Sequence, residues 1–355
     1  MKQRILIVNS GGDCPGMNAV IRAIVMRSKQ ESDWEIIGSV NGFDGILAEP
    51  LELVPLDENS VEGIHIKGGT ILMTNNKRNP FNYPVKQADG SFKNEDLSDK
   101  LIYNLKVLGF DAVIHIGGNE SHKISYKLYQ KGVNIIGIPK TINNDLSITD
   151  YTFGFQSAAQ TATEAVDKLM TTARSHNRVL ILEVMGRDAG WIALHAAIAG
   201  GAAVCLIPEI PFTMDKVLDK LKARYSKKGR RFAIIVVAEG AYLKGEKPET
   251  VPGTISRKIT AHLKEINFEP DIRESILGHL QRGGSPMAFD RILATELGVK
   301  SFELVLEKKF GTMAVHQNSE LTYIDIEKVI DQYNKVNLSH NLIHTAKGIG
   351  ISFGD

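Results

Sequence analysis

A short polar run at positions 139–145 has the composition of a site that handles anions and protons. It reads Pro-Lys-Thr-Ile-Asn-Asn-Asp and follows an apolar segment that predicts a strand. In an open α/β sheet, ligands bind at the carboxyl ends of the strands. The run offers an ammonium, a hydroxyl, an amide and a carboxylate, from Lys140, Thr141, Asn143 and Asp145. The same residues are also ordinary turn chemistry, so this run alone leaves a site and a turn equally open.

Two glycine turns each stand between an apolar run and a helical pattern. The first contains Gly11 and Gly12, and the second contains Gly117 and Gly118. Glycine lets backbone N–H groups approach a phosphate, and a helix N-terminus adds a favourable partial charge. The first turn has neither the P-loop spacing nor the dinucleotide fingerprint, so a structural turn stays an equal alternative there. Together the two turns indicate a cleft along one sheet.

Four arginines lie beside strand ends or glycines: Arg178, Arg187, Arg273 and Arg282. The guanidinium group is a planar fork that suits phosphate oxygens. Each arginine taken singly is more often part of a surface ion pair. Together with Glu239, which can accept hydrogen bonds from sugar hydroxyls, and with a histidine at 279, they predict a pocket for a phosphorylated polyol.

The composition indicates a globular protein, and the chain is long enough for two domains. The chain has 355 residues, of which 43% are hydrophobic, and its formal net charge is +1. So small a charge provides no field for nucleic acid or for a membrane surface, and we expect neither as a partner. No apolar segment near the N-terminus is long enough for a signal peptide or a membrane span, so we expect a cytoplasmic protein. Cys14 and Cys205 are expected to be free thiols.

Short β-branched runs alternate with amphipathic stretches along the chain. The runs that predict strands are 4–8, 36–40, 112–116, 134–138, 179–184, 203–207, 232–238 and 275–280. The stretches that predict helices are 17–29, 121–131, 157–174, 191–199, 214–226, 255–266 and 288–306. Because the runs are too apolar for a one-sided sheet, we expect an α/β fold with mainly parallel sheets covered by helices. The polar segment 88–99 is expected to be an exposed insertion.

Taken in order, these residues closely resemble the phosphofructokinase family over nearly the whole chain. The motifs are Gly-Gly-Asp-x-Pro-Gly-Met-Asn at 11–18, Gly-Gly-Thr at 68–70, Pro-Lys-Thr-Ile-x-Asn-Asp at 139–145, Val-Met-Gly-Arg at 184–187 and Leu-Gly-His-x-Gln-Arg-Gly-Gly-Ser-Pro at 277–286. The resemblance implies two Rossmann-like domains with the active site between them. The larger, donor-binding domain would comprise 1–154 and about 281–325, and the smaller, sugar-phosphate-binding domain 155–280 and about 326–355.

The resemblance also implies which residues bind substrates. Fructose 6-phosphate would be held by Thr141, Arg178, Met185, Gly186, Arg187, Glu239, Arg273, His279 and Arg282. Two of these, Arg178 and Arg273, reach in the family from a neighbouring subunit to the sugar 6-phosphate, which implies a homodimer or homotetramer. The phosphoryl donor, ATP or diphosphate, would contact Gly11, Gly12, Lys77, Arg78, Gly117, Gly118, Asn119, Glu120 and Ser121. Lys77 stands where the family has an arginine.

Two of the residues that would take part in phosphoryl transfer differ from those of the family. Asn119 replaces an aspartate that helps to hold Mg²⁺, and Asn143 replaces the aspartate that takes the proton of the attacking hydroxyl. A weakened Mg²⁺ site would rest on Asn119, Glu120 and Asp145. The catalytic set implied by the resemblance is Lys140, Thr141, Asn143, Asp145 and Arg187. Because an amide does not accept a proton near neutral pH, we expect impaired catalysis.

Two hypotheses follow. The first is an enzyme that transfers a phosphoryl group from ATP or diphosphate to the 1-hydroxyl of fructose 6-phosphate. The second is a catalytically inactive paralogue that binds fructose 6-phosphate or a nucleotide and regulates an active partner subunit. For the donor, Glu120 and Lys140 slightly favour diphosphate, because a carboxylate would repel the α-phosphate of ATP and an ammonium would pair with diphosphate. Alternatively, Glu120 caps the helix that begins near 121, or turns to solvent.

Overall fold

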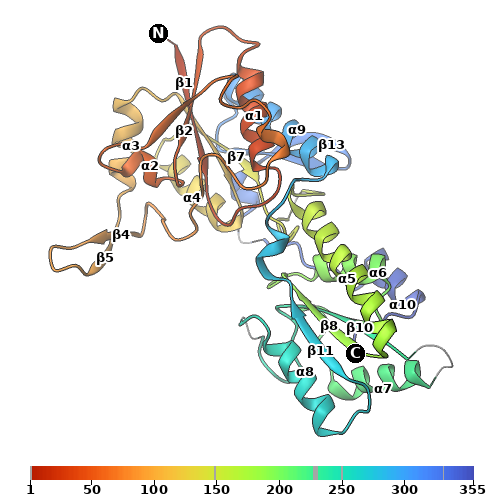
Figure 1. Ribbon diagram of the computed structural model, residues 1–355. Coiled ribbons are helices and arrows are strands. Elements are labelled where there is room, and N and C mark those ends of the chain that lie inside the picture. The colour runs from red at the N-terminus through yellow and green to blue at the C-terminus, as the bar shows by residue number, and fades with distance from the viewer. Residues whose placement is uncertain (1, 148, 227–230, 249–250, 331) are drawn as a thin grey trace. The chain divides into compact units, whose positions relative to one another are not determined.

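The computed structural model describes residues 2–147, 149–226, 231–248, 251–330 and 332–355 (Figure 1). The chain forms two compact units. Unit 1 comprises Met1–Ile142, Leu146–Gly154 and Arg282–Gln332, and unit 2 comprises Asn143–Asp145, Phe155–Gln281 and Tyr333–Asp355. Both units are therefore assembled from segments that lie far apart in the sequence.

Unit 1 is built on a seven-stranded sheet with the order β13-β12-β7-β6-β1-β2-β3. The strands are β1 (Gln3–Asn9), β2 (Trp34–Ser39), β3 (Leu53–Leu56), β6 (Ala112–Gly117), β7 (Ile135–Pro139), β12 (Thr312–Gln317) and β13 (Glu320–Asp325). The five inner strands are parallel, and only the edge pairs β2–β3 and β12–β13 are antiparallel. Because both faces are covered, β6 and β7 are buried along their whole length.

Helices cover both faces of this sheet (Figure 1). One layer holds α1 (Met17–Ser28) and α9 (Ala288–Leu306), and the other holds α3 (Ser98–Val107) and α4 (Asn119–Gln130), with the short α2 (Asp44–Leu47) beside α3. A Cβ atom at Gly298 of α9 would lie 2.7 Å from the Cβ atom of Ala23, so the glycine allows α1 and α9 to pack closely. Unit 1 also holds a hairpin of β4 (Tyr83–Lys86) and β5 (Phe92–Glu95), with 3₁₀ turns η1 (Ile64–Ile66) and η3 (Ile326–Lys328).

Unit 2 is built on four parallel strands with the order β11-β8-β10-β9. The strands are β8 (Val179–Val184), β9 (Val204–Leu206), β10 (Ala233–Ala238) and β11 (Ile272–Ile276). One face packs on α5 (Phe155–His176) and α6 (Trp191–Gly200), and the other on α7 (Met214–Tyr225) and α8 (Thr254–Glu265). Near the C-terminus α10 (Asn341–Gly348) packs on α6, and Ser352 forms a parallel bridge to Val204 of β9.

The α/β fold with mainly parallel, helix-covered sheets is confirmed, but some elements differ from the sequence prediction. The strand predicted over 275–280 is wrong, because β11 ends at Ile276 and a 3₁₀ turn, η2 (Gly278–Gln281), follows. Gly278 has a φ of 53°, which is outside the extended region of a strand and is readily adopted only by glycine. The segment 88–99 is largely exposed, as expected, but it contains β5 and the start of α3, which were not predicted. In β5 only Phe92 is apolar and it is exposed, so the sequence gave no strand signal.

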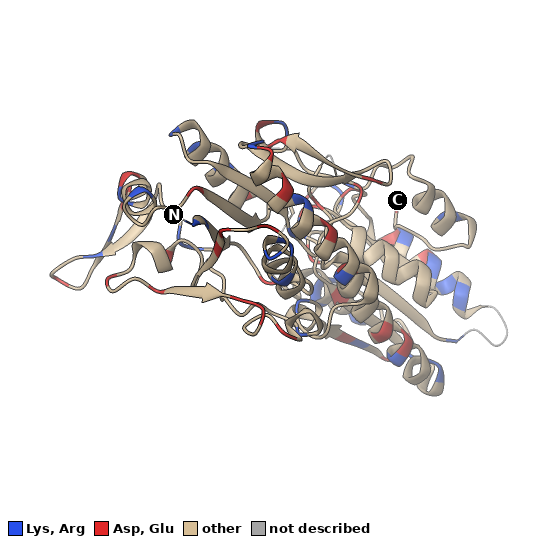
Figure 2. Cartoon of the chain, turned by 90° about the horizontal axis from the view of Figure 1, so that it is seen from above, with Lys and Arg blue, Asp and Glu red and all other residues tan. Residues whose placement is uncertain are grey.

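Charges of both signs are interspersed along the helices (Figure 2), as the near-equal numbers of 42 basic and 41 acidic residues suggest. In the part of the chain that the structure describes, no helix combines the length and the apolarity needed to span a bilayer. Both cysteines are buried free thiols, and burial raises the pKa of Cys14 to about 12. Neither thiol is therefore ionised near neutral pH.

Candidate functional site

The first glycine turn, after β1, is held in place by groups of unit 1 itself. The N–H of Gly11 donates to the carbonyl of Asn75 at 3.0 Å, and the Thr74 hydroxyl donates to the carbonyl of Gly11 at 2.7 Å. The Lys140 ammonium, which is only 3% exposed, donates to the carbonyl of Gly12. Lys140 therefore stabilises the turn by binding its backbone.

Arg282 lies against the same turn. Its Nη1 donates to the carbonyl of Asp13 at 3.1 Å, and a Cβ atom at Gly12 would lie 2.7 Å from that nitrogen. Gly12 thus makes the space that the guanidinium occupies. The structure therefore brings together four residues of the predicted site. Gly11 and Gly12 were predicted to bind the donor, Arg282 to bind the sugar phosphate, and Lys140 to take part in catalysis.

The second glycine turn, after β6, opens the N-terminus of α4. Gly118 is the N-cap residue and supplies no side-chain hydrogen bond to the helix. A Cβ atom at Gly117 would overlap the side chain of Ser121, which is buried. A 12-residue helix that begins on a glycine turn presents N–H groups and a partial positive charge, which suit a phosphate.

The two polar residues in the first turn of α4 are engaged within unit 1. The Asn119 amide donates to the carbonyl of Gln332 at 3.2 Å. The Glu120 carboxylate pairs with the Lys123 ammonium at 2.7 Å, and the Glu120 side chain is 75% exposed. The carboxylate therefore forms a solvated i, i+3 ion pair on the helix surface.

The two basic residues near the first turn differ in surroundings. Lys77 is exposed, whereas Arg78 pairs with Asp44 at 3.6 Å and lies 5.2 Å from the ring of Tyr83. Asp44 also accepts a hydrogen bond from Asn41 at 2.9 Å, and burial raises the pKa of its carboxyl group. Arg78 is thus part of a polar cluster within unit 1, and its donor role stays a prediction.

Beneath the second turn lie two buried histidines. His115 bridges the hydroxyls of Ser10 and Ser125, each at 2.7 Å, and His122 hydrogen-bonds to the carbonyl of Ile138 at 3.2 Å. Burial lowers the pKa of both rings, that of His122 to about 4, and the nearby Lys140 acts in the same direction. Both imidazoles are therefore neutral at pH 7 and serve as hydrogen-bonding supports.

We expect this burial to make unit 1 less stable in acid. The unfolded histidine has a pKa near 6.5 and binds its proton first as the pH falls, so the stability present above pH 6.5 is lost toward pH 4. For His122 alone the loss at pH 5 is roughly 2 kcal/mol. Hydrogen exchange of the β6 and β7 amides at pH 7.5 and 5 measures it. His122→Gln should reduce the pH dependence, whereas exposed His344→Gln should not; an equal pH dependence in all three proteins would refute this.

In unit 2, the segment Asn143–Asp145 is anchored by Asn334. The Asn334 N–H donates to the carbonyl of Asp145, and its side-chain amide donates to the carbonyl of Asn144, both at 3.0 Å. Trp191 Nε1 donates in turn to the carbonyl of Asn334 at 2.8 Å. Within the segment, the Asn143 amide donates to the Asp145 carboxylate at 3.4 Å. The predicted base position thus presents an N–H group to the remaining carboxylate.

Three adjacent strands of unit 2 end in residues predicted to bind the sugar phosphate. Met185–Arg187 follow β8, Glu239 follows β10, and His279 lies in η2 after β11. Because these strands are parallel, their carboxyl ends meet at one edge of the sheet. The turn after β8 is held by the N–H of Gly240, which donates to the carbonyl of Gly186 at 3.1 Å, and by the N–H of Met185, which donates to the Gln281 side chain at 3.2 Å.

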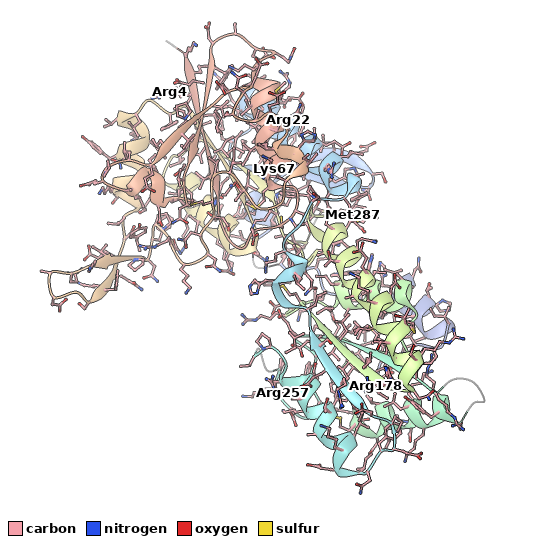
Figure 3. All side chains as sticks on the ribbon, in the orientation of Figure 1. Arg4, Arg22, Lys67, Arg178, Arg257 and Met287 are labelled. Atoms are coloured by element: carbon pink, nitrogen blue, oxygen red, sulfur yellow. The ribbon has the colours of Figure 1, made fainter. Side chains whose placement is uncertain are left out.

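The other two predicted arginines lie at the opposite, amino-terminal edge of the same sheet. Arg178 immediately precedes β8 (Figure 3), and Arg273 is the second residue of β11. The carboxylate of Asp271 binds both, with Arg178 Nε at 2.8 Å. Since β8 has six residues, the two edges are roughly 20 Å apart. A single copy of unit 2 therefore does not unite these arginines with Arg187, Glu239 and His279.

Several residues near these groups had no role in the sequence analysis. Gln281 is fully buried and supports Met185; its place in the motif at 277–286 was a usable signal. Asp271 and Asn334 gave no signal, because Arg178 and the segment Asn143–Asp145, which they bind, are distant from them in sequence.

Among the described residues, no three His, Cys, Asp or Glu side chains could together hold a metal. The predicted Mg²⁺ set has two carboxylates and one amide, so it is not such a group and stays a prediction. Asn119 faces Gln332, and Glu120 pairs with Lys123. Asp145 is the one carboxylate of the predicted set that lies beside Asn143. Mg²⁺ commonly takes only one or two carboxylates and completes its shell with water and substrate phosphates, so Asp145 fits such an ion.

The chain is similar to known proteins over most of its length. A sequence model of the phosphofructokinase family matches residues 4–305. A curated relative from Clostridium perfringens, named ATP-dependent 6-phosphofructokinase 2, is 44% identical over 99% of both chains, and an ATP-dependent 6-phosphofructokinase of Chloroflexus aggregans is 42% identical over 100% of this chain and 98% of its own.

Solved structures show the same fold. Phosphofructokinase from Saccharomyces cerevisiae superposes with a TM-score of 0.79 at 30% identity, covering 98% of this chain, which spans 47% of the yeast chain. A pyrophosphate-dependent phosphofructokinase from Marinobacter aquaeolei has a TM-score of 0.82 at 22% identity, covering 99% of this chain and 88% of its own, and shows the fold alone. The expected resemblance is thereby confirmed: the chain belongs to the phosphofructokinase family.

Proposed function

We propose that the protein transfers a phosphoryl group from ATP to the 1-hydroxyl of fructose 6-phosphate, with a slow chemical step. The observation that carries this proposal is the convergence of Arg187, Glu239 and His279 at the carboxyl ends of three adjacent parallel strands. A guanidinium, a carboxylate and an imidazole in that place suit a phosphorylated polyol. The relatives at 44% and 42% identity are named for the same acceptor and donor.

The slow step follows from the chemistry of the segment Asn143–Asp145. The Asn143 amide takes up no proton, so the attacking hydroxyl must lose its proton to Asp145 or to water. Mg²⁺, when bound, would neutralise charge on the transferring phosphoryl group, and Asp145 would hold it together with the donor phosphates. One carboxylate would then have to serve both purposes, which limits the rate.

For the donor, the relatives named as ATP-dependent support ATP, and two contacts weaken the case for diphosphate. The Glu120 carboxylate, which was expected to repel an α-phosphate, forms a solvated ion pair with Lys123. The Lys140 ammonium, which was expected to pair with diphosphate, is buried against the carbonyl of Gly12. Both arguments for diphosphate are thus weakened, and the open N-terminus of α4 suits the phosphates of either donor.

We further propose that the acceptor site is completed by a neighbouring copy in a homodimer or homotetramer. Arg178 and Arg273 lie at the edge of the sheet opposite to Arg187, so their guanidinium groups can serve a sugar phosphate only in another copy. The second hypothesis, an inactive subunit that regulates an active paralogue, is favoured by one observation. The Asn119 amide donates to the carbonyl of Gln332, and the Asn143 amide donates to the Asp145 carboxylate. Both side chains thus have a structural role that does not require catalysis.

Binding of fructose 6-phosphate tests the acceptor site separately from catalysis. We expect Arg282→Ala to weaken binding by about 1.5 to 3 kcal/mol, the range for a hydrogen bond to a charged group. Calorimetry of the oligomer measures it. Arg291→Ala is the matched control, because Arg291 also donates one hydrogen bond to a backbone carbonyl of unit 1, that of Pro286. If the unaltered protein binds no sugar phosphate at millimolar concentration, the proposal fails.

Asp271 competes with phosphate for the two arginines at the amino-terminal edge. We expect Asp271→Asn to tighten fructose 6-phosphate binding by about 0.5 to 1 kcal/mol, because it removes one negative charge and keeps an acceptor oxygen at an exposed site. The same calorimetric titration measures the change, and exposed Asp219→Asn in α7 serves as control. Weaker binding by Asp271→Asn would show instead that this carboxylate holds the arginines in their binding position.

A further inference from the structure

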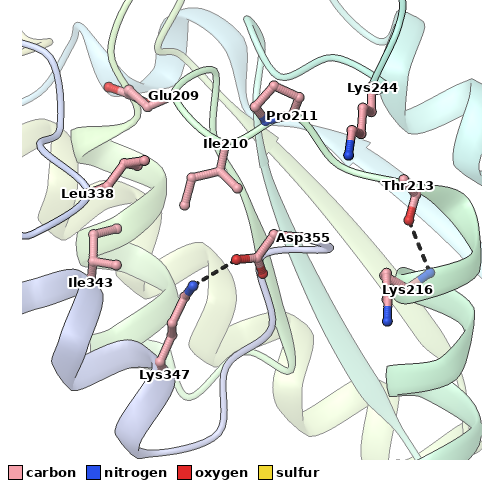
Figure 4. A pocket seen from close by; sticks show the side chains of 10 residues that line it. All are labelled: Glu209, Ile210, Pro211, Thr213, Lys216, Lys244, Leu338, Ile343, Lys347 and Asp355. Carbon is pink, nitrogen blue, oxygen red and sulfur yellow. Dashed lines mark hydrogen bonds and ion pairs between the residues drawn. The ribbon is translucent and has the colours of Figure 1, made fainter.

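Unit 2 contains a cavity of about 440 Å³ that none of the predicted active-site residues lines (Figure 4). It lies between the start of α7, the loop after β9 and the C-terminal segment that includes α10. A volume of this size is within the range of small-molecule sites. The cavity is formed entirely by unit 2.

The lining of the cavity is divided by chemistry (Figure 4). Lys216, Lys244 and the hydroxyl of Thr213 stand on the side of α7, and Leu338 and Ile343 stand on the opposite side. Ile210 and Pro211 lie between these two sides. One end of a ligand would thus meet two lysines, and the other end would meet Leu338 and Ile343, beside which lie Glu209 and the Lys347–Asp355 ion pair.

The charges of the lining are not balanced among the described residues. Lys347 pairs with Asp355 at 2.7 Å, but the ammonium groups of Lys216 and Lys244 have no hydrogen-bond or ion-pair partner in the described parts of the chain. The Glu209 carboxylate instead accepts from the N–H groups of Gly190 and Val336. Lys216 and Lys244 are therefore exposed cations without a direct partner in the described part of the chain, in a lining of three lysines and two carboxylates that carries one excess positive charge.

The N-terminus of α7 adds to this field. The helix is 12 residues long and begins at Met214, and the Thr213 hydroxyl accepts from the N–H of Lys216. The helix dipole places a partial positive charge beside Lys216. Two ammonium groups and a helix N-terminus together match the charge of a phosphate monoester, which is nearly a dianion at pH 7.

We propose that this cavity binds a small organic phosphate whose apolar body rests on Leu338 and Ile343 and whose phosphate lies between Lys216 and Lys244. The site is distinct from the one that would hold fructose 6-phosphate, because none of Arg187, Glu239, His279 or Arg282 lines it. Its ligand would be held by its shape and charge.

The probe is 1-naphthyl phosphate, a fluorescent aromatic phosphate, titrated into the full-length protein in the presence of saturating fructose 6-phosphate and ATP. We expect saturable binding below millimolar concentration. We expect Lys216→Met and Lys244→Met each to weaken it about tenfold, as loss of a charge-assisted contact does. Lys222→Met is the matched control, because Lys222 is an exposed residue of α7 outside the cavity, and it should have no effect.

Two further binding experiments test whether the protein recognises the apolar body of the probe as well as its phosphate. Inorganic phosphate, which lacks the apolar body, should bind at least tenfold more weakly. Leu338→Ser should weaken naphthyl phosphate binding about threefold or more, whereas Ile349→Ser, at a position of nearly equal exposure (60% against 59%), should not. The proposal is overturned if binding is absent, if the lysine variants bind like the unaltered protein, or if fructose 6-phosphate or ATP displaces the probe.

Discussion

Replacing Asn143 by Asp is expected to raise the rate of phosphoryl transfer at least tenfold, within the roughly 10²- to 10⁴-fold range of a positioned general base. The amide now donates to Asp145 at 3.4 Å. A carboxylate in its place would put two acids side by side, which raises the pKa of one of them toward neutrality and suits it to accept a proton. Turnover with saturating fructose 6-phosphate and ATP measures the gain, with KM recorded separately.

Asn144→Asp is the matched control for this change. It adds a carboxylate one position away in the same anchored segment, where the carbonyl of residue 144 keeps its bond from Asn334. We expect no gain in turnover from it, and a larger gain when Asn119→Asp accompanies Asn143→Asp. If the unaltered protein already turns over at the ~10 s⁻¹ median of enzymes, the interpretation of Asn143 as a missing base is wrong.

Gly240→Ala is expected to reduce sugar-phosphate affinity more than tenfold and to destabilise unit 2 by about 1 to 3 kcal/mol, as overpacking does. A Cβ atom at this position would overlap the backbone carbonyl of Arg187, which cannot rotate away as a side chain could. The turn would have to move and would break the bond from the Gly240 N–H to Gly186. Calorimetry and thermal unfolding report the two effects.

Gly348→Ala is the control for that substitution. Gly348 lies in α10, its φ is ordinary for an L-residue, and a Cβ atom there meets nothing within 4 Å. We expect unchanged binding and stability equal to or above that of the unaltered protein. A Gly240→Ala variant that binds fructose 6-phosphate normally would show that the turn carrying Arg187 is not part of the acceptor site.

The sequence predicted those parts of the site that lie in local motifs. The β-branched run 179–184 followed by Met185, Gly186 and Arg187 indicated a strand ending in a binding turn, and the structure has β8 followed by that turn. The parallel order of β11, β8 and β10 then places Glu239 and His279 at the same edge. Periodicity and glycine placement sufficed here because the strand and its turn are contiguous in the chain.

The sequence did not predict contacts that depend on side-chain direction or on distant segments. Glu120 could face the donor phosphates or solvent with the same sequence, and only the structure shows its pairing with Lys123. The Asp271 carboxylate joins Arg178 to Arg273 only because β8 and β11 are neighbours, although 93 residues separate Asp271 from Arg178. The β12–β13 hairpin was missed because its outer strand is half polar.

The most direct test of the proposed function is a ³¹P NMR time course of the unaltered protein with fructose 6-phosphate and Mg²⁺, run once with ATP and once with diphosphate. We predict that fructose 1,6-bisphosphate accumulates with ATP, at a rate well below the ~10 s⁻¹ enzyme median, and more slowly with diphosphate. The kinase proposal is contradicted if a stoichiometric amount of protein forms no bisphosphate from either donor while it still binds the sugar phosphate. The hypothesis of an inactive regulatory subunit would then remain.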